Sequence, residues 1–178
     1  MEEMFKKSYK LTGTHATKTR QLSYILDDRF DQKLYSTFIS AIIDASLVGF
    51  LYGTKAEKNE ADNDELSIKE DTVSNYSQQF KYNFRLILLS DKEYEPDLEK
   101  RIDKAFRGNK LTLEDEELFH SYVRGGIDIL YKKLIEDCDK AEDYSHKIRE
   151  LLEEMRDFFY KDINNTDILK LANNIKTV

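Results

Sequence analysis

The sequence predicts an all-α, single-domain protein, a bundle of six or seven helices around a buried central helix at about 34–53. The chain of 178 residues is long enough for one compact domain with its own core. It contains one Pro and six Gly, and 35% of its residues are charged, a composition that favours helices. The stretch LYSTFISAIIDASLVGFLYG is almost wholly apolar and of helix length, so the rest of the protein must cover it.

The first helix is expected over about 14–27. Thr14 can cap its start with a hydroxyl, and three apolar residues follow at the spacing of one helix face: Leu22, Ile25 and Leu26. The central helix should stop at Gly53, where a left-handed cap costs least. Residues 54–72 are polar and charged, and we expect them to form a mobile loop, as we do for the basic segment 1–12.

The second half of the chain holds the remaining expected helices. Pro96 should open a short fourth helix that ends before Gly108, and Thr112 with Asp115 resembles the capping box of a long fifth helix. The other expected spans are about 73–90 for the third helix, 141–160 for the sixth and 167–175 for a short terminal one. The residues expected to point inward from the third and fourth helices are Phe80, Phe84, Ile87, Leu88, Leu98, Ile102 and Phe106.

Gly125 and Gly126 fall inside the expected fifth helix, where each glycine costs about 1 kcal/mol relative to alanine. A close crossing of another helix at Gly126 would offset this cost, and a kink is the alternative explanation. The run Arg124-Gly125-Gly126 is also a candidate contact surface, because missing side chains permit a partner to approach closely.

Asp44 is the one acid in the central apolar stretch, and a buried acid must find a partner or lose its charge. Arg85 is its natural partner, because it lies among apolar residues of another expected helix. We therefore expect a buried Asp44–Arg85 pair that fixes helix register and adds little net stability. A ligand site and a catalytic role for Asp44 are the alternatives. Asp44 also interrupts the apolar run 38–52, which is too short to span a bilayer comfortably, so no membrane contact is expected.

The net charge of −7 is unevenly distributed along the chain. The first 20 residues carry five basic and two acidic side chains, a net charge of +3, so the remainder carries −10. A basic segment can bind nucleic acid or an acidic protein, and it can also be only a solvated terminus. The candidate interaction residues in this segment are Lys6, Lys7, Lys10, Lys18 and Arg20.

Sequence features of an enzyme are mostly missing. Glycine-rich phosphate loops and the nucleophile-elbow motif are absent. Glu117 with His120, and Asp143 with His146, each place a carboxylate and an imidazole on one helix face. Helical di-iron sites use Glu-x-x-His twice, with a further Glu from each of two other helices. The central and third helices offer no inward Glu, so we expect no metal, no cofactor and no catalytic residue.

Cys138 is the only cysteine, so it cannot form an internal disulfide, which favours a reducing compartment. The acids on both sides of Cys138 should raise the pKa of its thiol, which argues against a nucleophile. The N-terminus has no apolar run of the kind found in a signal peptide. These features predict a cytoplasmic protein.

Three segments resemble parts of small, largely uncharacterised helical proteins of bacteria. They are residues 30–53 (F-x4-Y-x5-A-x7-G-x3-G), residues 101–107 (RIDKAFR) and residues 119–127 (FHSYVRGGI). The first is also similar to accessory proteins encoded beside DNA-phosphorothioation and restriction-type defence genes. The resemblance covers about half of the chain and concerns packing motifs. It implies a prokaryotic source and an accessory role near defence machinery, and it transfers no functional residues.

Together these observations predict a non-catalytic adaptor or subunit that acts by protein–protein contact, in a setting such as a prokaryotic antiphage assembly. A protein partner or a homo-oligomer is expected. The alternatives are association with nucleic acid through the N-terminal bases, an acidic surface that mimics DNA, and a metalloenzyme. The residues of the metalloenzyme alternative would be Glu117, His120, Asp143 and His146.

Overall fold

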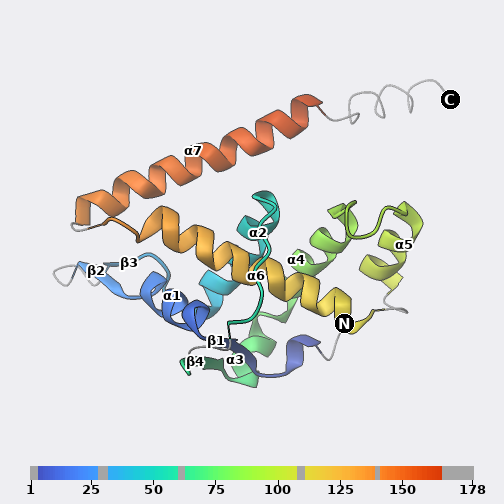
Figure 1. The fold of residues 1–178 in the computed structure, drawn as a ribbon, viewed down its shortest axis with the longest axis horizontal. Helices are drawn as coiled ribbons and strands as arrows, with labels where there is room; N and C mark the ends of the chain where they lie inside the picture. The colour runs from blue at the N-terminus through green and yellow to red at the C-terminus, as the bar shows by residue number, and fades with distance from the viewer. Residues whose placement is uncertain (1–3, 28–31, 60–62, 108–110, 139–140, 166–178) are drawn as a thin grey trace. The chain divides into compact units, whose positions relative to one another are not determined.

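The structure is a computed structural model that describes residues 4–27, 32–59, 63–107, 111–138 and 141–165. Its described part contains seven α-helices and two small two-stranded sheets, so the predicted all-α class is confirmed (Figure 1). Contacts between residues divide the chain into two units, Met1–Glu136 and Asp137–Val178, a division that the sequence did not indicate. Each unit is described by itself.

The first unit contains all elements except the last helix. Its helices are the 3-10 turn η1 (Met4–Lys6), α1 (Thr14–Leu22), α2 (Phe38–Leu51), α3 (Glu70–Asn75), α4 (Ser77–Ser90), α5 (Leu98–Ile102), the π-helical turn η2 (Asp103–Arg107) and α6 (Leu113–Leu134). Its strands are β1 (Tyr9–Thr12), β2 (Ile25–Asp27), β3 (Gln32–Lys33) and β4 (Glu65–Ile68). The second unit contains α7 (Ala141–Asn165).

Helices α2 and α6 cross closely at the centre of the first unit, and small residues make the crossing possible (Figure 1). A Cβ built on Gly126 would lie 1.8 Å from the carbonyl oxygen of Ala45, and one on Gly49 would lie 2.0 Å from that of Tyr122. The predicted crossing at Gly126 is therefore confirmed, and α6 continues unbroken through both of its glycines. Gly53, with φ +61°, provides the predicted left-handed end of α2.

The core beside this crossing is built on aromatic rings from three elements. Phe5 of η1 stacks on Phe80 of α4 with ring centroids 5.3 Å apart. Phe84 of α4 and Phe119 of α6 meet the Phe5 ring edge to face. Since Phe5 is fully buried, the N-terminal segment is anchored in the core, and its described part is not the solvated terminus that we allowed for.

Helix α5 buries a different face from the one predicted. Leu98 and Phe106 are 54% and 60% exposed, whereas Arg101 and Ala105 are buried. The buried residues, Arg101 and Ala105, each precede an expected inward residue, Ile102 or Phe106, by one position. The helix has only five residues, capped by the Asp97 carboxylate, before it widens into the π-helical turn η2 and loses the regular 3.6-residue period.

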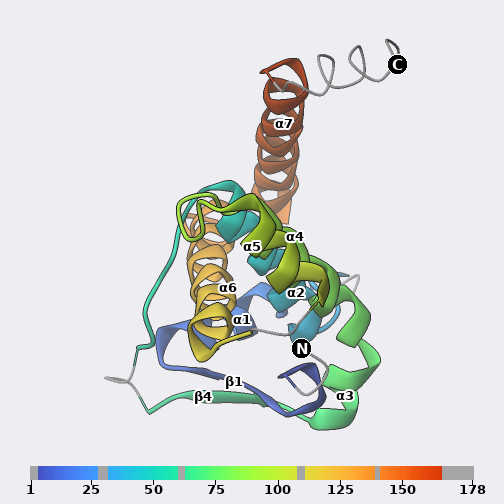
Figure 2. The ribbon, with the colours of Figure 1, turned by 90° about the vertical axis from the view of Figure 1, so that its right-hand side faces the viewer.

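Two strands occur where the sequence predicted other structure. Residues 54–72 are not the expected loop, because β4 lies among them and pairs with β1 in antiparallel fashion (Figure 2). Leu66 and Ile68 alternate with exposed residues and supply the buried face of β4. Helix α1 ends at Leu22 instead of residue 27, and the chain continues into β2, which pairs with β3. The predicted cap of α1 was also wrong, because Gly13 holds the cap position.

The second unit contributes one described helix. Helix α7 has 25 residues and extends five residues beyond the predicted span of 141–160. The predicted terminal helix at 167–175 lies outside the described residues. No helix in the described ranges combines the length and apolarity needed to cross a membrane.

Candidate binding groove

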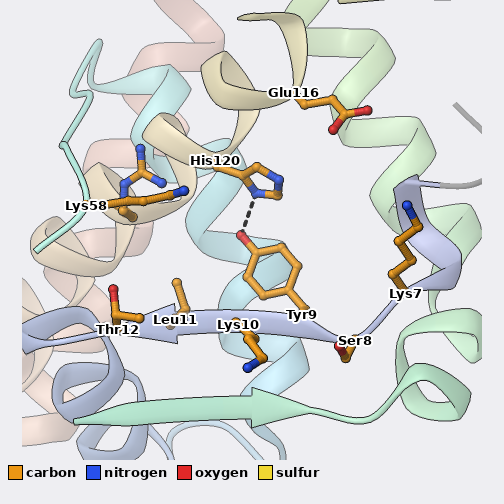
Figure 3. A pocket seen from close by; sticks show the side chains of 10 residues that line it. Lys7, Ser8, Tyr9, Lys10, Leu11, Thr12, Lys58, Glu116 and His120 are labelled. Atoms are coloured by element: carbon orange, nitrogen blue, oxygen red, sulfur yellow. Dashed lines mark hydrogen bonds between the residues drawn. The ribbon is translucent and has the colours of Figure 1, made fainter. Parts of the chain in front are cut away.

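A groove with a volume of about 510 Å³ lies between β1 and the N-terminal half of α6 (Figure 3). The α6 wall consists of Glu116, His120 and Arg124, which share a helix face because they are spaced four residues apart. Lys58 enters from the segment 54–59, which connects α2 toward β4. The ten residues that line this β1–α6 groove are Lys7, Ser8, Tyr9, Lys10, Leu11, Thr12, Lys58, Glu116, His120 and Arg124.

Strand β1 pairs with β4 along one edge and turns its other edge toward the groove. In the antiparallel register Thr12 lies opposite Glu65, and the next pair along is Gly13 with Asp64. The N–H of Gly13 donates to the carbonyl of Asp64 at 2.7 Å, which identifies this pair as hydrogen-bonded. Because hydrogen-bonded and non-hydrogen-bonded pairs alternate, Lys10 and Thr12 direct their main-chain N–H and C=O groups away from β4. In the described ranges no second strand pairs with these groups, and we call them the open edge of β1.

A side chain bonds one carbonyl on the outer edge of β4. In the same register the carbonyl of Glu65 points away from β1. The guanidinium of Arg20, from α1, donates to this carbonyl and also to the carboxylate of Asp64. Within the described part of the chain, the β1 edge is therefore the less obstructed edge of this sheet.

His120 lines the groove and is hydrogen-bonded to a residue of β1. Its Nδ1 lies 3.0 Å from the hydroxyl of Tyr9 (Figure 3). Burial lowers the pKa of His120 to about 4 and raises the pKa of Tyr9 above its usual range. Both groups are therefore neutral near pH 7, and the tautomer of His120 decides which of the two donates this bond.

Arg124 is a buried residue of the α6 wall that binds the segment 54–59. Its side chain is 5% exposed, its Nε donates to the carbonyl of Ala56 at 2.8 Å, and its guanidinium forms an ion pair with Glu117. The N–H of Ala56 donates in turn to the main chain of α6 at 3.0 Å. These bonds hold the segment 54–59 against α6 and so place Lys58 beside the groove.

The groove lining carries more positive than negative charge. Lys7, Lys10 and Lys58 are exposed, and Glu116 is the one acid among the lining residues. Lys10 pairs with Glu65 at 3.1 Å, but both side chains are about half exposed, and such pairs contribute only about 0–1 kcal/mol. Lys10 can exchange this partner for a carboxylate of a ligand at little cost.

The candidate interaction residues of the N-terminus separate into two groups. Lys7 and Lys10 line the groove, and Lys6 is exposed just before it. Lys18 instead donates to Asp128 at 2.6 Å, and Arg20 holds the edge of β4, so these two residues serve contacts within the first unit.

The predicted contact surface at Arg124-Gly125-Gly126 was wrong for the two glycines, whereas Arg124 lines the β1–α6 groove. All three residues are buried, and a Cβ on Gly125 would lie 2.1 Å from the carbonyl oxygen of Thr54. The missing side chains permit close approach, as expected, but the neighbours that approach are the chain's own α2 and the residues that follow it.

The predicted buried pair of Asp44 and Arg85 was also wrong, because both side chains are exposed. Asp44 lies on the outer face of α2 and accepts a hydrogen bond from Tyr35. Partial burial of its carboxyl raises the pKa of Asp44, and the Tyr35 bond opposes this effect. The polar side chain that α4 does direct to α2 is Asn83, whose amide donates to the Ile43 carbonyl at 3.0 Å.

The candidate metal ligands are engaged elsewhere or lie in different units. Glu117 pairs with an arginine and His120 with a tyrosine, as described above, whereas Asp143 and His146 belong to α7. In the described ranges no group of three or more His, Cys, Asp or Glu residues could hold a metal ion. The pKa of the Cys138 thiol is raised, as we expected, and burial is the largest cause.

Comparison of the chain with protein-family models, with curated proteins and with solved structures gives no match in any of the three. No residue role can therefore be carried over from a relative. The interpretation of the groove depends on its own geometry and charge.

Proposed function

We propose that this protein is a non-catalytic adaptor that acts by protein–protein contact, with the β1–α6 groove as its contact site. The observation that supports this proposal is the open main-chain edge of β1, which faces a groove instead of a packed neighbour. Unpaired strand edges are templates for association with another chain, and native proteins usually cover them. Here Arg20 bonds a carbonyl on the other edge of the same sheet, whereas in the described part of the chain no strand besides β4 pairs with β1.

Nucleic-acid association is the second candidate, and the structure offers it less support. Three of the five N-terminal bases, Lys10, Lys18 and Arg20, are engaged in ion pairs within the first unit. The chain as a whole carries a net charge of −7, which favours binding to a long phosphate backbone only weakly. The resemblance of residues 30–53 to defence-associated proteins supports placing the adaptor in an antiphage assembly.

Photo-crosslinking in the native host tests the proposal. The full chain carries p-benzoylphenylalanine in place of Ser8, which lines the groove, or in place of Ser67 as a matched control. Both serines are exposed, but Ser67 belongs to β4 and is outside the groove lining. Irradiation should attach a defined protein to the chain labelled at position 8 and not to the chain labelled at position 67.

The same experiment can contradict the proposal in two ways. Equal crosslinking from positions 8 and 67, or a purified chain that remains a lone monomer without any crosslinked protein, would remove the groove as a contact site. A crosslinked product that nuclease digests would move the assignment to nucleic acid.

A further inference from the structure

The open edge of β1 sets a directional requirement on whatever binds there. Lys10 and Thr12 offer main-chain N–H donors and C=O acceptors at alternate positions along the groove. An extended peptide offers the same groups at the same repeat, and its strand would lie about 4.8 Å from β1. A helix satisfies its own main-chain groups and cannot supply this pattern.

The length of the groove suits a short strand. Strand β1 has four residues, Tyr9–Thr12, which extend about 13 Å at the rise of a strand. The α6 wall from Glu116 to Arg124 extends about 12 Å at the rise of a helix. An added strand therefore finds main-chain partners along β1 and side-chain contacts along α6 at the same time.

The side chains of the groove select the charge of that strand. Lys10 projects to the exposed face of the sheet, where it would meet the residue directly opposite on an added strand. Lys58 offers a charged donor on the α6 side. Glu116 is the one acid among the lining residues and four of them are basic, so an acidic ligand is favoured over a basic one.

We propose that the β1–α6 groove binds an extended, acidic segment of a partner protein as a third strand beside β1. This inference depends on the proposed adaptor function and specifies how its contact site recognises a partner. The main chain of the added strand supplies the affinity, and its acidic side chains supply the selectivity.

Peptides selected from a random decapeptide library, with the full chain as bait, test the inference. They should be rich in Asp and Glu and should bind more weakly as salt is raised. Lys10→Pro removes the N–H that faces the groove and leaves the β1–β4 bonds intact, so it should weaken peptide binding at least twentyfold. Lys10→Ala removes only the charge and should weaken binding two- to fivefold.

The matched control is Ser67→Pro, at the β4 position directly opposite Lys10. The N–H that this proline removes lies on the outer edge of β4, away from the groove. Peptide binding should therefore stay within twofold of that of the unmodified chain. Amide hydrogen exchange gives a second readout, since peptide binding should slow the exchange of Lys10 and Thr12. It also verifies folding of the proline variants, through continued protection of Leu11.

Each alternative outcome has a separate meaning. If position 8 crosslinks a protein that Lys10→Pro binds as tightly as the unmodified chain, strand addition is overturned and the adaptor function remains. If selection enriches basic peptides, or the groove binds oligothymidylate in preference to any peptide, the acidic-strand assignment is overturned. If neither peptide nor protein binds at the groove, both proposals fail.

Discussion

Gly126→Ala tests the central packing of the first unit. The added methyl group would lie 1.8 Å from the carbonyl oxygen of Ala45, whereas ordinary contacts begin at about 3.4 Å. The shortfall is roughly 1.6 Å, and the opposing atom is main chain, which cannot rotate aside as a flexible side chain can. Helices α2 and α6 would therefore have to separate along their whole crossing.

The expected loss of stability follows from two opposing effects. Replacing glycine by alanine inside a helix stabilises the helix by about 1 kcal/mol. Overpacking of a tight core typically costs 1–3 kcal/mol and more where backbone must move, so we expect a net loss of about 3 kcal/mol in the free energy of unfolding. At about 2–4 °C per kcal/mol, the Tm should fall by roughly 10 °C.

Thermal and urea unfolding followed by circular dichroism at 222 nm provide the measurement. Gly53→Ala is the control, because a Cβ at Gly53 meets nothing within 4 Å and the substitution tests only the left-handed φ of +61°. That control should cost about 1–2 kcal/mol. If Gly126→Ala were as stable as the unmodified chain, the close crossing of α2 and α6 would be wrong.

Three further predictions concern charged and titrating groups. Asp115→Ala should cost about 3 kcal/mol in urea unfolding, because it leaves the half-buried Lys104, now 2.7 Å from the carboxylate, without its partner. Burial opposes the charged form of Asp115, but its hydrogen bonds outweigh burial and lower its pKa. The stability that this carboxylate contributes should therefore be lost as the pH drops below about 4. The Asp115→Asn variant should lose less stability over the same pH range. The ring of His120 should titrate near pH 4 by NMR; because the unfolded chain then binds more protons, stability should decline as pH falls from about 6.5 to 4, and a midpoint near 6.5 would contradict its burial. Asp44→Ala and Arg85→Ala should each change the free energy of unfolding by less than about 0.5 kcal/mol, since both side chains are exposed; a loss of several kcal/mol would restore the buried pair.

The cap of α6 and the inward stripe of α4 could be predicted from the sequence because both are local. Thr112 and Asp115 form the predicted capping box, with each side chain bonded to the main chain of the other residue. The stripe at Phe80 and Phe84 is buried as predicted, because four-residue spacing is sufficient to define one face of a helix. Gly126 also predicted the helix crossing, because a glycine inside a helix is unfavourable unless a close neighbour leaves no room for a side chain.

The strands and the groove could not be predicted from helical composition, because they depend on pairing between distant segments. Tyr9 and Leu11 alternate with polar residues, as do Leu66 and Ile68, but each alternation covers only four residues. Such short patterns become meaningful only once the register joins them across more than fifty residues of chain. Lys58 was overlooked for this reason, and His120 was weighed as a metal ligand and not as part of a groove, since its place is defined only once β1 lies opposite α6.

Asp44 illustrates a different limit of reasoning from composition. An apolar stretch of helix length predicts a covered helix, but it does not show whether every side is covered. Helix α2 buries Ile42 and Ala45, while Asp44 lies exposed between them in sequence. One acid in such a stretch marks the side that faces water, which is a simpler reading than a buried ion pair.

The contact from Arg20 to the carbonyl of Glu65 also affects how copies of this chain meet one another. Open-ended fibres grow when one sheet margin docks on the opposite margin of the next molecule, indefinitely. If a partner strand adds to β1 as we propose, the Arg20 side chain at the Glu65 carbonyl would hinder a further strand from adding beside β4. Open-ended association of sheets between copies of the chain would then be disfavoured.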